Sequence, residues 1–149
     1  MSQHSPLPLL IELANNERDA VARQLATAQR LFSDNETQHK SLQSYQDEYL
    51  LRLGRTKQSG TAELRNFQAF LAKLELAIKQ QTAAVEQHRL RVSTLKGEFT
   101  RISIKAKSLE VLHQQRLRSA GQREKRREQD IEDEHAARMA LRPLVFGTA

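Results

Sequence analysis

The sequence has no cysteine, no tryptophan, three prolines and five glycines, and its only aromatic residues are two tyrosines and five phenylalanines. Without cysteine, disulfides, thiolate metal sites and cysteine nucleophiles are excluded. The sequence has few helix breakers and no run rich in Val, Ile, Thr and aromatic residues, which favours long helices over a sheet. No segment approaches the roughly 18 apolar residues of a membrane helix, and the N-terminus does not resemble a signal peptide. We therefore expect a soluble, cytoplasmic, helical protein.

Sequence motifs for catalysis are also missing. The chain has no GxxxxGK[ST] loop, no GxGxxG turn and no GxSxG elbow. None of its five histidines has another four positions away, so one helix face does not offer two metal ligands. The sequence therefore predicts a protein that is not an enzyme and that has no cofactor and no metal.

Apolar residues recur at alternating steps of four and three along two segments. Eight of twelve such positions are apolar in the first segment and eleven of thirteen in the second. A spacing that averages 3.5 residues predicts the buried seam of a coiled coil. The positions are Ala14, Arg18, Val21, Leu25, Ala28, Phe32, Asn35, His39, Leu42, Gln46, Tyr49 and Leu53, then Phe67, Leu71, Leu74, Ile78, Gln81, Val85, His88, Val92, Leu95, Phe99, Ile102, Ala106 and Leu109.

The stretch GRTKQSG, residues 54 to 60, separates the two seams and predicts a turn between helices. We expect an all-α fold: one antiparallel coiled-coil hairpin with helix one at about 9–53 and helix two at about 61–140. Residues 141–149 would be a flexible tail. Folding back about position 57 pairs residues whose numbers sum to about 114, such as Leu42 with Ala72, Phe32 with Thr82 and Leu10 with Ile104.

The second seam loses its apolar character soon after Leu109, close to residue 105, where helix one ends and helix two loses its partner. This coincidence supports the hairpin and predicts that the rest of helix two overhangs it. The polar seam positions include Asn35, His39, Gln81 and His88. Such residues usually fix register or oligomeric state, and metal binding is the minor alternative.

Charge is concentrated in the second half of the chain. Residues 89–127 carry twelve Lys and Arg against three Glu, and an acidic block follows at 128–134. Such runs are either solvated helix faces or a basic rod offered to an acidic surface, whether protein or nucleic acid.

Both tyrosines lie beside the predicted turn. Leu42, Tyr45 and Tyr49 form a ridge that Gln38 extends, and the second helix carries Phe70 beside its seam, in a line with Leu74, Ala77 and Gln81. This apolar face is wider than one partner helix covers. It either thickens the end of the hairpin or forms a protein-binding patch.

The runs SYQDEY at residues 44–49 and NFQAFLAKLELAIKQQ at 66–81 resemble the FliJ proteins of the bacterial flagellar type III export apparatus. The opening SQHSPLPLLIELA, the length and the hairpin layout are similar too. The resemblance implies a cytoplasmic coiled-coil stalk, peripherally associated with the inner membrane at the flagellar base. It would insert in the export ATPase ring, link the ring to the export gate, and handle the chaperones of late export substrates.

The resemblance also implies which residues meet these partners. Gln81 departs from the family pattern, which suggests a histidine there, so the polar contact at that position is in doubt. The end of the rod where the N- and C-terminal segments meet would face the ATPase, with basic side chains meeting acidic groups of the ring. The implied gate-binding patch is Gln38, Leu42, Tyr45, Tyr49, Phe70, Leu74, Ala77 and Gln81; the expected ATPase contacts are Arg116, Arg118, Arg123, Lys125, Arg126 and Arg127.

Two alternatives stay open from sequence alone. The first is a basic coiled coil that binds nucleic acid, which counterion release would favour. Against it, only Phe99 interleaves the basic run, and the acidic block would be repelled by phosphate. The second is an injectisome stalk of the same general type.

Overall fold

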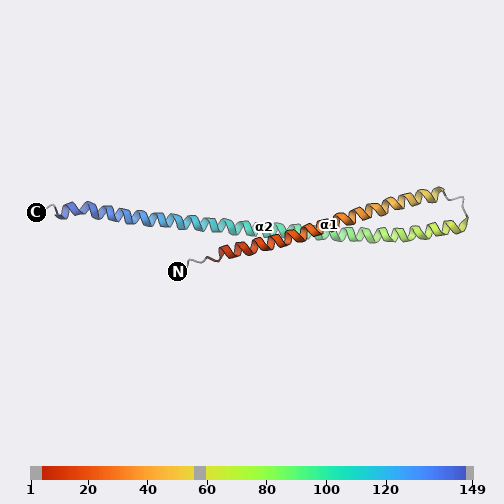
Figure 1. Cartoon of the computed structure of the whole chain (residues 1–149), viewed down its shortest axis with the longest axis horizontal. Coiled ribbons are helices and arrows are strands. Elements are labelled where there is room, and N and C mark those ends of the chain that lie inside the picture. Colours follow the sequence, from red (N-terminus) through yellow and green to blue (C-terminus); the bar gives the residue numbers. More distant parts are fainter. Residues whose placement is uncertain (1–4, 56–59, 147–149) are drawn as a thin grey trace. The chain divides into compact units, whose positions relative to one another are not determined.

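The structure is a computed structural model, and it describes the backbone of residues 5–55 and 60–146 and the side chains of these residues up to Arg142. In these ranges it consists of two helices, α1 (Leu7–Arg55) and α2 (Thr61–Phe146), and no strand (Figure 1). The predicted all-α antiparallel hairpin is confirmed. Residues 56–59 of the predicted turn and 147–149 of the predicted tail lie outside the described residues.

Both helices extend slightly further than the spacing of apolar residues indicated. α1 begins at Leu7, two residues before the expected start, because the Leu7 N–H donates to Ser5 Oγ at 3.2 Å. Ser5 thus caps the helix, and Pro6 occupies the first turn, where its missing N–H costs nothing. α2 continues through Pro143 to Phe146, beyond the expected end near residue 140. One proline removes one backbone hydrogen bond and need not end a helix that continues on both sides.

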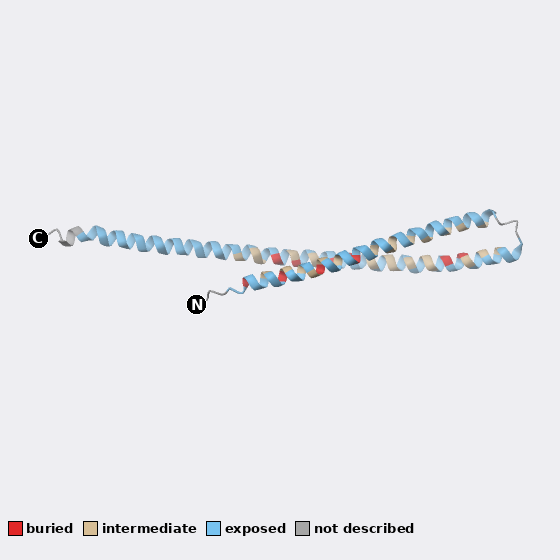
Figure 2. Ribbon diagram, viewed as in Figure 1, coloured by how far each residue is buried: buried red, intermediate tan, exposed pale blue. Residues whose placement is uncertain are grey.

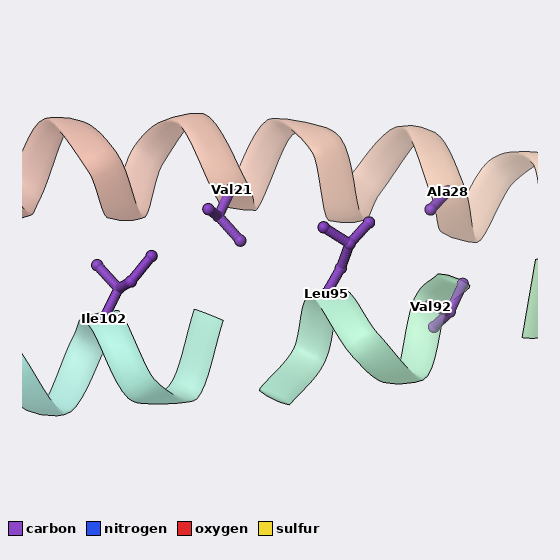
Figure 3. Close-up of a cluster of buried hydrophobic side chains, with 5 residues drawn as sticks. All are labelled: Val21, Ala28, Val92, Leu95 and Ile102. Atoms are coloured by element: carbon purple, nitrogen blue, oxygen red, sulfur yellow. The ribbon is translucent and has the colours of Figure 1, made fainter. Parts of the chain in front are cut away.

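The chain packs as two compact units. One comprises Asn15–Ser103, and the other combines Met1–Ala14 with Ile104–Ala149. In the first unit, α1 and α2 run antiparallel and bury a cluster formed by Val21, Ala28, Val92, Leu95 and Ile102 (Figure 3). Leu95 and Ile102 are each 1% exposed. Full burial of a side chain of this size stabilises the folded state by about 1.5 to 3 kcal/mol.

The predicted seam agrees with the observed burial. Every one of its positions is buried or half-buried, including the polar ones, and no charged or polar residue is fully buried in the part of the chain whose side chains are described. Alternating steps of four and three keep one stripe of each helix on the same side, so the pattern identifies the buried stripe without knowledge of the partner.

In the second unit, Leu7 and Ala14 of α1 and Ala106 of α2 are buried. From Gln114 to Arg142 every residue of α2 is exposed on all faces (Figure 2). This segment is the overhang expected from the loss of apolar periodicity. Its helix is held by backbone hydrogen bonds and helix propensity rather than by packing.

The predicted pairing register needs a correction. Cross-helix contacts join Asn35 to Gln81 and His39 to Thr82, whose numbers sum to 116 and 121 rather than 114. Thr82 therefore forms its cross-helix hydrogen bond with His39, one heptad along α1 from the expected neighbour Phe32. Leu10 and Ile104, another expected pair, are both exposed. The prediction assumed a turn centred on residue 57, but α1 ends at Arg55 and α2 begins at Thr61, which shifts the centre toward 58.

Candidate functional site

Four aromatic rings meet across the two helices in unit Asn15–Ser103. The Tyr49 ring lies with its centroid 4.4 Å from that of Phe70 and 4.9 Å from that of Phe67. Tyr45 lies 6.1 Å from Tyr49 and 6.1 Å from Phe70, the latter in an edge-to-face arrangement. These are the separations at which aromatic pairs attract beyond simple burial. The cluster ties the end of α1 to the start of α2.

The four rings differ in how much surface they leave to solvent. Tyr49, Phe67 and Phe70 are half-buried, whereas Tyr45 is 46% exposed. Tyr45 is therefore a large aromatic side chain that is held by neighbouring rings and still offers about half of itself to a partner. Phe67 completes the cluster, although the patch implied by the resemblance did not contain it. Its place on the seam, four positions before Leu71, was the available clue.

A shallow groove of about 480 Å³ runs beside Tyr45. Its walls come mainly from α1, and Gln81 is the contribution of α2. Thr37 and Ser41, which the expected patch did not include, supply hydroxyl groups. The lining residues are Thr37, Gln38, Ser41, Leu42, Tyr45 and Gln81.

Polar seam residues form hydrogen bonds between the two helices near this groove. Gln81 Nε2 donates to the Oδ1 of Asn35 at 2.9 Å and to its backbone O at 3.0 Å. His39 Nε2 lies 2.9 Å from Thr82 Oγ1, which itself donates to the carbonyl of Ile78. Since the Thr82 hydroxyl has one proton, His39 Nε2 carries the hydrogen and donates it. Hydrogen bonds at Asn35, His39 and Gln81 thus support the interpretation that these side chains fix the register. No cluster of three metal-ligating groups occurs among the described residues.

All eight residues of the expected gate-binding patch lie on one edge of the hairpin. In heptad notation, with seam positions a and d, Leu42, Tyr49, Leu74 and Gln81 occupy d positions, and Gln38, Tyr45, Phe70 and Ala77 occupy g positions. Because the helices run antiparallel, g positions of α1 face g positions of α2, as the contact between Tyr45 and Phe70 shows. We call this surface the g edge. Leu74 is only 7% exposed, so it supports the neighbouring side chains from beneath.

The basic residues expected to meet the ATPase lie on α2 in the other unit. All six are exposed, and three of them, Arg123, Arg126 and Arg127, line a shallow groove together with Asp130, Ile131 and Glu134. Cations and carboxylates thus share one face of the helix there. The aromatic rings belong to unit Asn15–Ser103, and the six basic residues belong to the other unit.

The described residues define a helical protein of the antiparallel coiled-coil hairpin class, with an aromatic cluster at the turn end of its first unit. Neither α1 nor α2, as far as they are described, contains a stretch apolar enough over the length a bilayer requires to span a membrane.

The comparisons with known proteins give the family. The family model for the flagellar FliJ protein matches residues 3–144. The chain is 32% identical to the flagellar FliJ protein of Salmonella typhi and 30% identical to that of Escherichia coli K12, each over 144 residues, 95% of this chain and 98% of the relative. No solved structure matches. The chain belongs to the flagellar FliJ family, as its aromatic motifs indicated.

Proposed function

We propose that this protein is a non-catalytic component of the bacterial flagellar type III export apparatus. It acts as a coiled-coil stalk that inserts in the export ATPase ring, links that ring to the export gate, and handles the chaperones of late export substrates. It works at the flagellar base, peripherally associated with the inner membrane. Membership of the flagellar FliJ family supports the flagellar assignment.

The observation that carries the gate-binding part is the half-exposed ring of Tyr45, held against Phe70 and Tyr49 beside a groove. Binding energy at protein interfaces concentrates in a few aromatic anchors that are rigid before binding, since little side-chain entropy is then lost. Tyr45 meets this description. The half-buried Phe70 fixes the orientation of the Tyr45 ring. The polar Gln38 and Gln81 line the same groove and can form hydrogen bonds at the rim of the interface.

The ATPase-binding part draws on the unit that contains the N-terminal residues and the C-terminal part of α2. Leu9 and Leu13 are 59% and 55% exposed, and Val111 is 43% exposed. Exposed aliphatic side chains at this density mark a surface that a partner covers. Beyond them, the exposed basic residues from Arg116 to Arg127 supply charge that steers association with an acidic surface.

Binding of the purified export gate protein tests the proposal. Tyr45→Ala with Phe70→Ala is expected to weaken binding more than about tenfold, the scale for lost aromatic anchors. Leu51→Ala with Leu76→Ala removes two exposed leucines on the outer faces and serves as the matched control, with binding unchanged. Motility and late-substrate secretion should fall with the first pair only.

Normal gate binding by the Tyr45 and Phe70 variant would reject the gate-linker role and leave the rings as packing at the turn end. A parallel salt titration with plain duplex DNA addresses the basic run. Tight binding that weakens steeply with salt would instead favour nucleic acid as the partner.

A further inference from the structure

A second groove, of about 470 Å³, opens on unit Asn15–Ser103, away from the aromatic rings. Six of its lining residues come from α1 and two from α2, so it lies where the two helices meet. Its floor contains small side chains, Ala20 and the buried Ala28, which leave the hollow unfilled. The lining residues are Ala20, Arg23, Gln24, Thr27, Ala28, Leu31, His88 and Arg91.

This groove repeats the position of the aromatic patch two heptads along the hairpin. Moving 14 positions forward on α1 and 14 back on α2, about 21 Å, converts five of its eight lining residues into members of that patch. The correspondence is Gln24 with Gln38, Ala28 with Leu42, Leu31 with Tyr45, His88 with Leu74, and Arg91 with Ala77. Both surfaces therefore lie on the g edge and have the same relation to the two helix axes.

The chemistry of the two surfaces differs. Leu31, 44% exposed, stands where the other surface has Tyr45. Exposed Arg23 on α1 and exposed Arg91 on α2 bring one cation from each helix to the groove, and the half-buried His88 lies between the helices. No carboxylate is among the lining residues, all of which belong to the described part of the chain. The result is an apolar floor between two positive charges.

We propose that this groove docks an acidic amphipathic helix of a partner protein. The partner helix places apolar side chains at one-turn spacing on Leu31 and Ala28, and its carboxylates meet Arg23 and Arg91 on either side. A groove between two parallel cylinders suits a third helix, which packs its ridge of side chains into it. Arginine is suited to such contacts because its planar head binds a carboxylate through two hydrogen bonds.

The charges around the groove favour this occupant over nucleic acid. Along the same face of α1, Glu17 and Asp34 are exposed and acidic, one on each side of the basic pair. The positive region is therefore limited to a few helical turns. The phosphates of a nucleic acid would extend beyond the basic pair and be repelled by both acidic residues. A helix whose carboxylates form one local group would avoid this repulsion. This inference does not depend on the proposed function, because it concerns a different part of the g edge.

The test uses the full chain and a fluorescein-labelled synthetic helical peptide of about 18 residues, about 27 Å long. The peptide carries leucine at positions i, i+4, i+7 and i+11, and glutamate on both flanks of that stripe. One matched peptide has lysine in place of glutamate, and another has serine in place of leucine. Fluorescence anisotropy measures the affinity, and circular dichroism confirms that each protein variant stays helical.

We expect the acidic peptide to bind and both matched peptides to bind at least about tenfold more weakly. Arg23→Glu with Arg91→Glu should reduce the affinity by more than about tenfold. The control is Lys40→Glu with Lys96→Glu, which changes the net charge equally on exposed positions away from the g edge and should alter affinity less than about twofold. Leu31→Ser should weaken binding without changing its salt dependence.

Three results would overturn the inference: no binding of the acidic peptide, equal losses in the two charge-reversed proteins, or equal binding of the serine peptide. The second would indicate attraction by net charge alone, and the third a groove without apolar recognition. Tyr45→Ala with Phe70→Ala should leave peptide binding unchanged, so failure of this inference and failure of the gate proposal give different patterns.

Discussion

Gln81 donates from one amide nitrogen to both oxygens of Asn35, at 2.9 Å to Oδ1 and 3.0 Å to the backbone carbonyl. Asn35 in turn donates from Nδ2 to the carbonyl of Leu31 at 2.7 Å. The two bonds donated by Gln81 link α2 to α1 in the seam. Any slip of one helix would break them and leave part-buried polar atoms without partners, which costs about 1 to 3 kcal/mol for each group.

This relationship predicts that Asn35→Leu with Gln81→Leu raises the melting temperature while relaxing the register. Apolar side chains pack in the seam without desolvating amides, but they fit equally well one heptad away. Because the chain has no cysteine, spin labels can be placed on cysteines introduced at Lys40 and Lys79, both exposed. Electron resonance should give one distance in the parent and a second population in the double variant, from a shift of about 10 Å along the axis.

A single narrow distance in the double variant would mean that the turn and the aromatic cluster set the register without the amides. The labelled parent, measured at the same temperature, is the control for movement of the labels.

Leu95 is 1% exposed and belongs to the buried cluster drawn in Figure 3. Leu95→Asp should lower the free energy of unfolding by about 3 kcal/mol or more, because a carboxylate there loses its water and finds no cation. The neighbouring Lys96→Asp is exposed and should change stability by no more than about 0.5 kcal/mol. Thermal melting followed by circular dichroism compares them. Equal melting curves for Leu95→Asp and the parent would show that Leu95 faces solvent.

The two tyrosines should separate stability from binding. Tyr49 contacts three rings and is half-buried, so Tyr49→Ala should destabilise the fold by about 2 to 4 kcal/mol. Tyr45 is 46% exposed, and Tyr45→Ala should cost less than about 1.5 kcal/mol. Urea unfolding measures both. A larger loss from Tyr45→Ala than from Tyr49→Ala would contradict the view that Tyr49 is the packing residue and Tyr45 the exposed anchor.

The exposed part of α2, Gln114 to Arg142, has no packing partner in the described chain and should exchange its amide hydrogens quickly when free. Adding the export ATPase is expected to slow this exchange. Arg123→Glu, Arg126→Glu and Arg127→Glu together should slow association and flatten its dependence on salt, since lost cations remove electrostatic steering. Gate binding through Tyr45 and Phe70 should persist.

The control for that triple variant is Arg101→Glu with Lys105→Glu and Lys107→Glu, which makes the same change in net charge on other exposed positions. If both triple variants slow association equally, the effect belongs to total charge. Full protection of the exposed segment in the free protein, or no gain with the ATPase, would contradict the account of ordering on binding.

Which face of each helix is buried follows from the local pattern of apolar residues. Steps of four and three through Val21, Leu25 and Ala28 are a local property of one chain segment, and each helix must bury its apolar stripe whatever its partner is. The end of the paired region could be predicted for the same reason, since the second seam loses its apolar periodicity soon after Leu109. The sequence likewise shows that Tyr45 and Phe70 are aromatic residues outside the seam positions.

How the two stripes meet depends instead on contacts between the helices. Neighbouring registers of a heptad repeat bury similar apolar area, so the choice falls to contacts between residues far apart in the chain, such as Gln81 with Asn35 and Tyr49 with Phe70. The groove at Arg23 and Arg91 depends on that choice, because its two walls come from different helices. Periodicity places Arg91 at a g position of α2 and Arg23 on the outer side of α1, and the antiparallel pairing brings the two to the same groove.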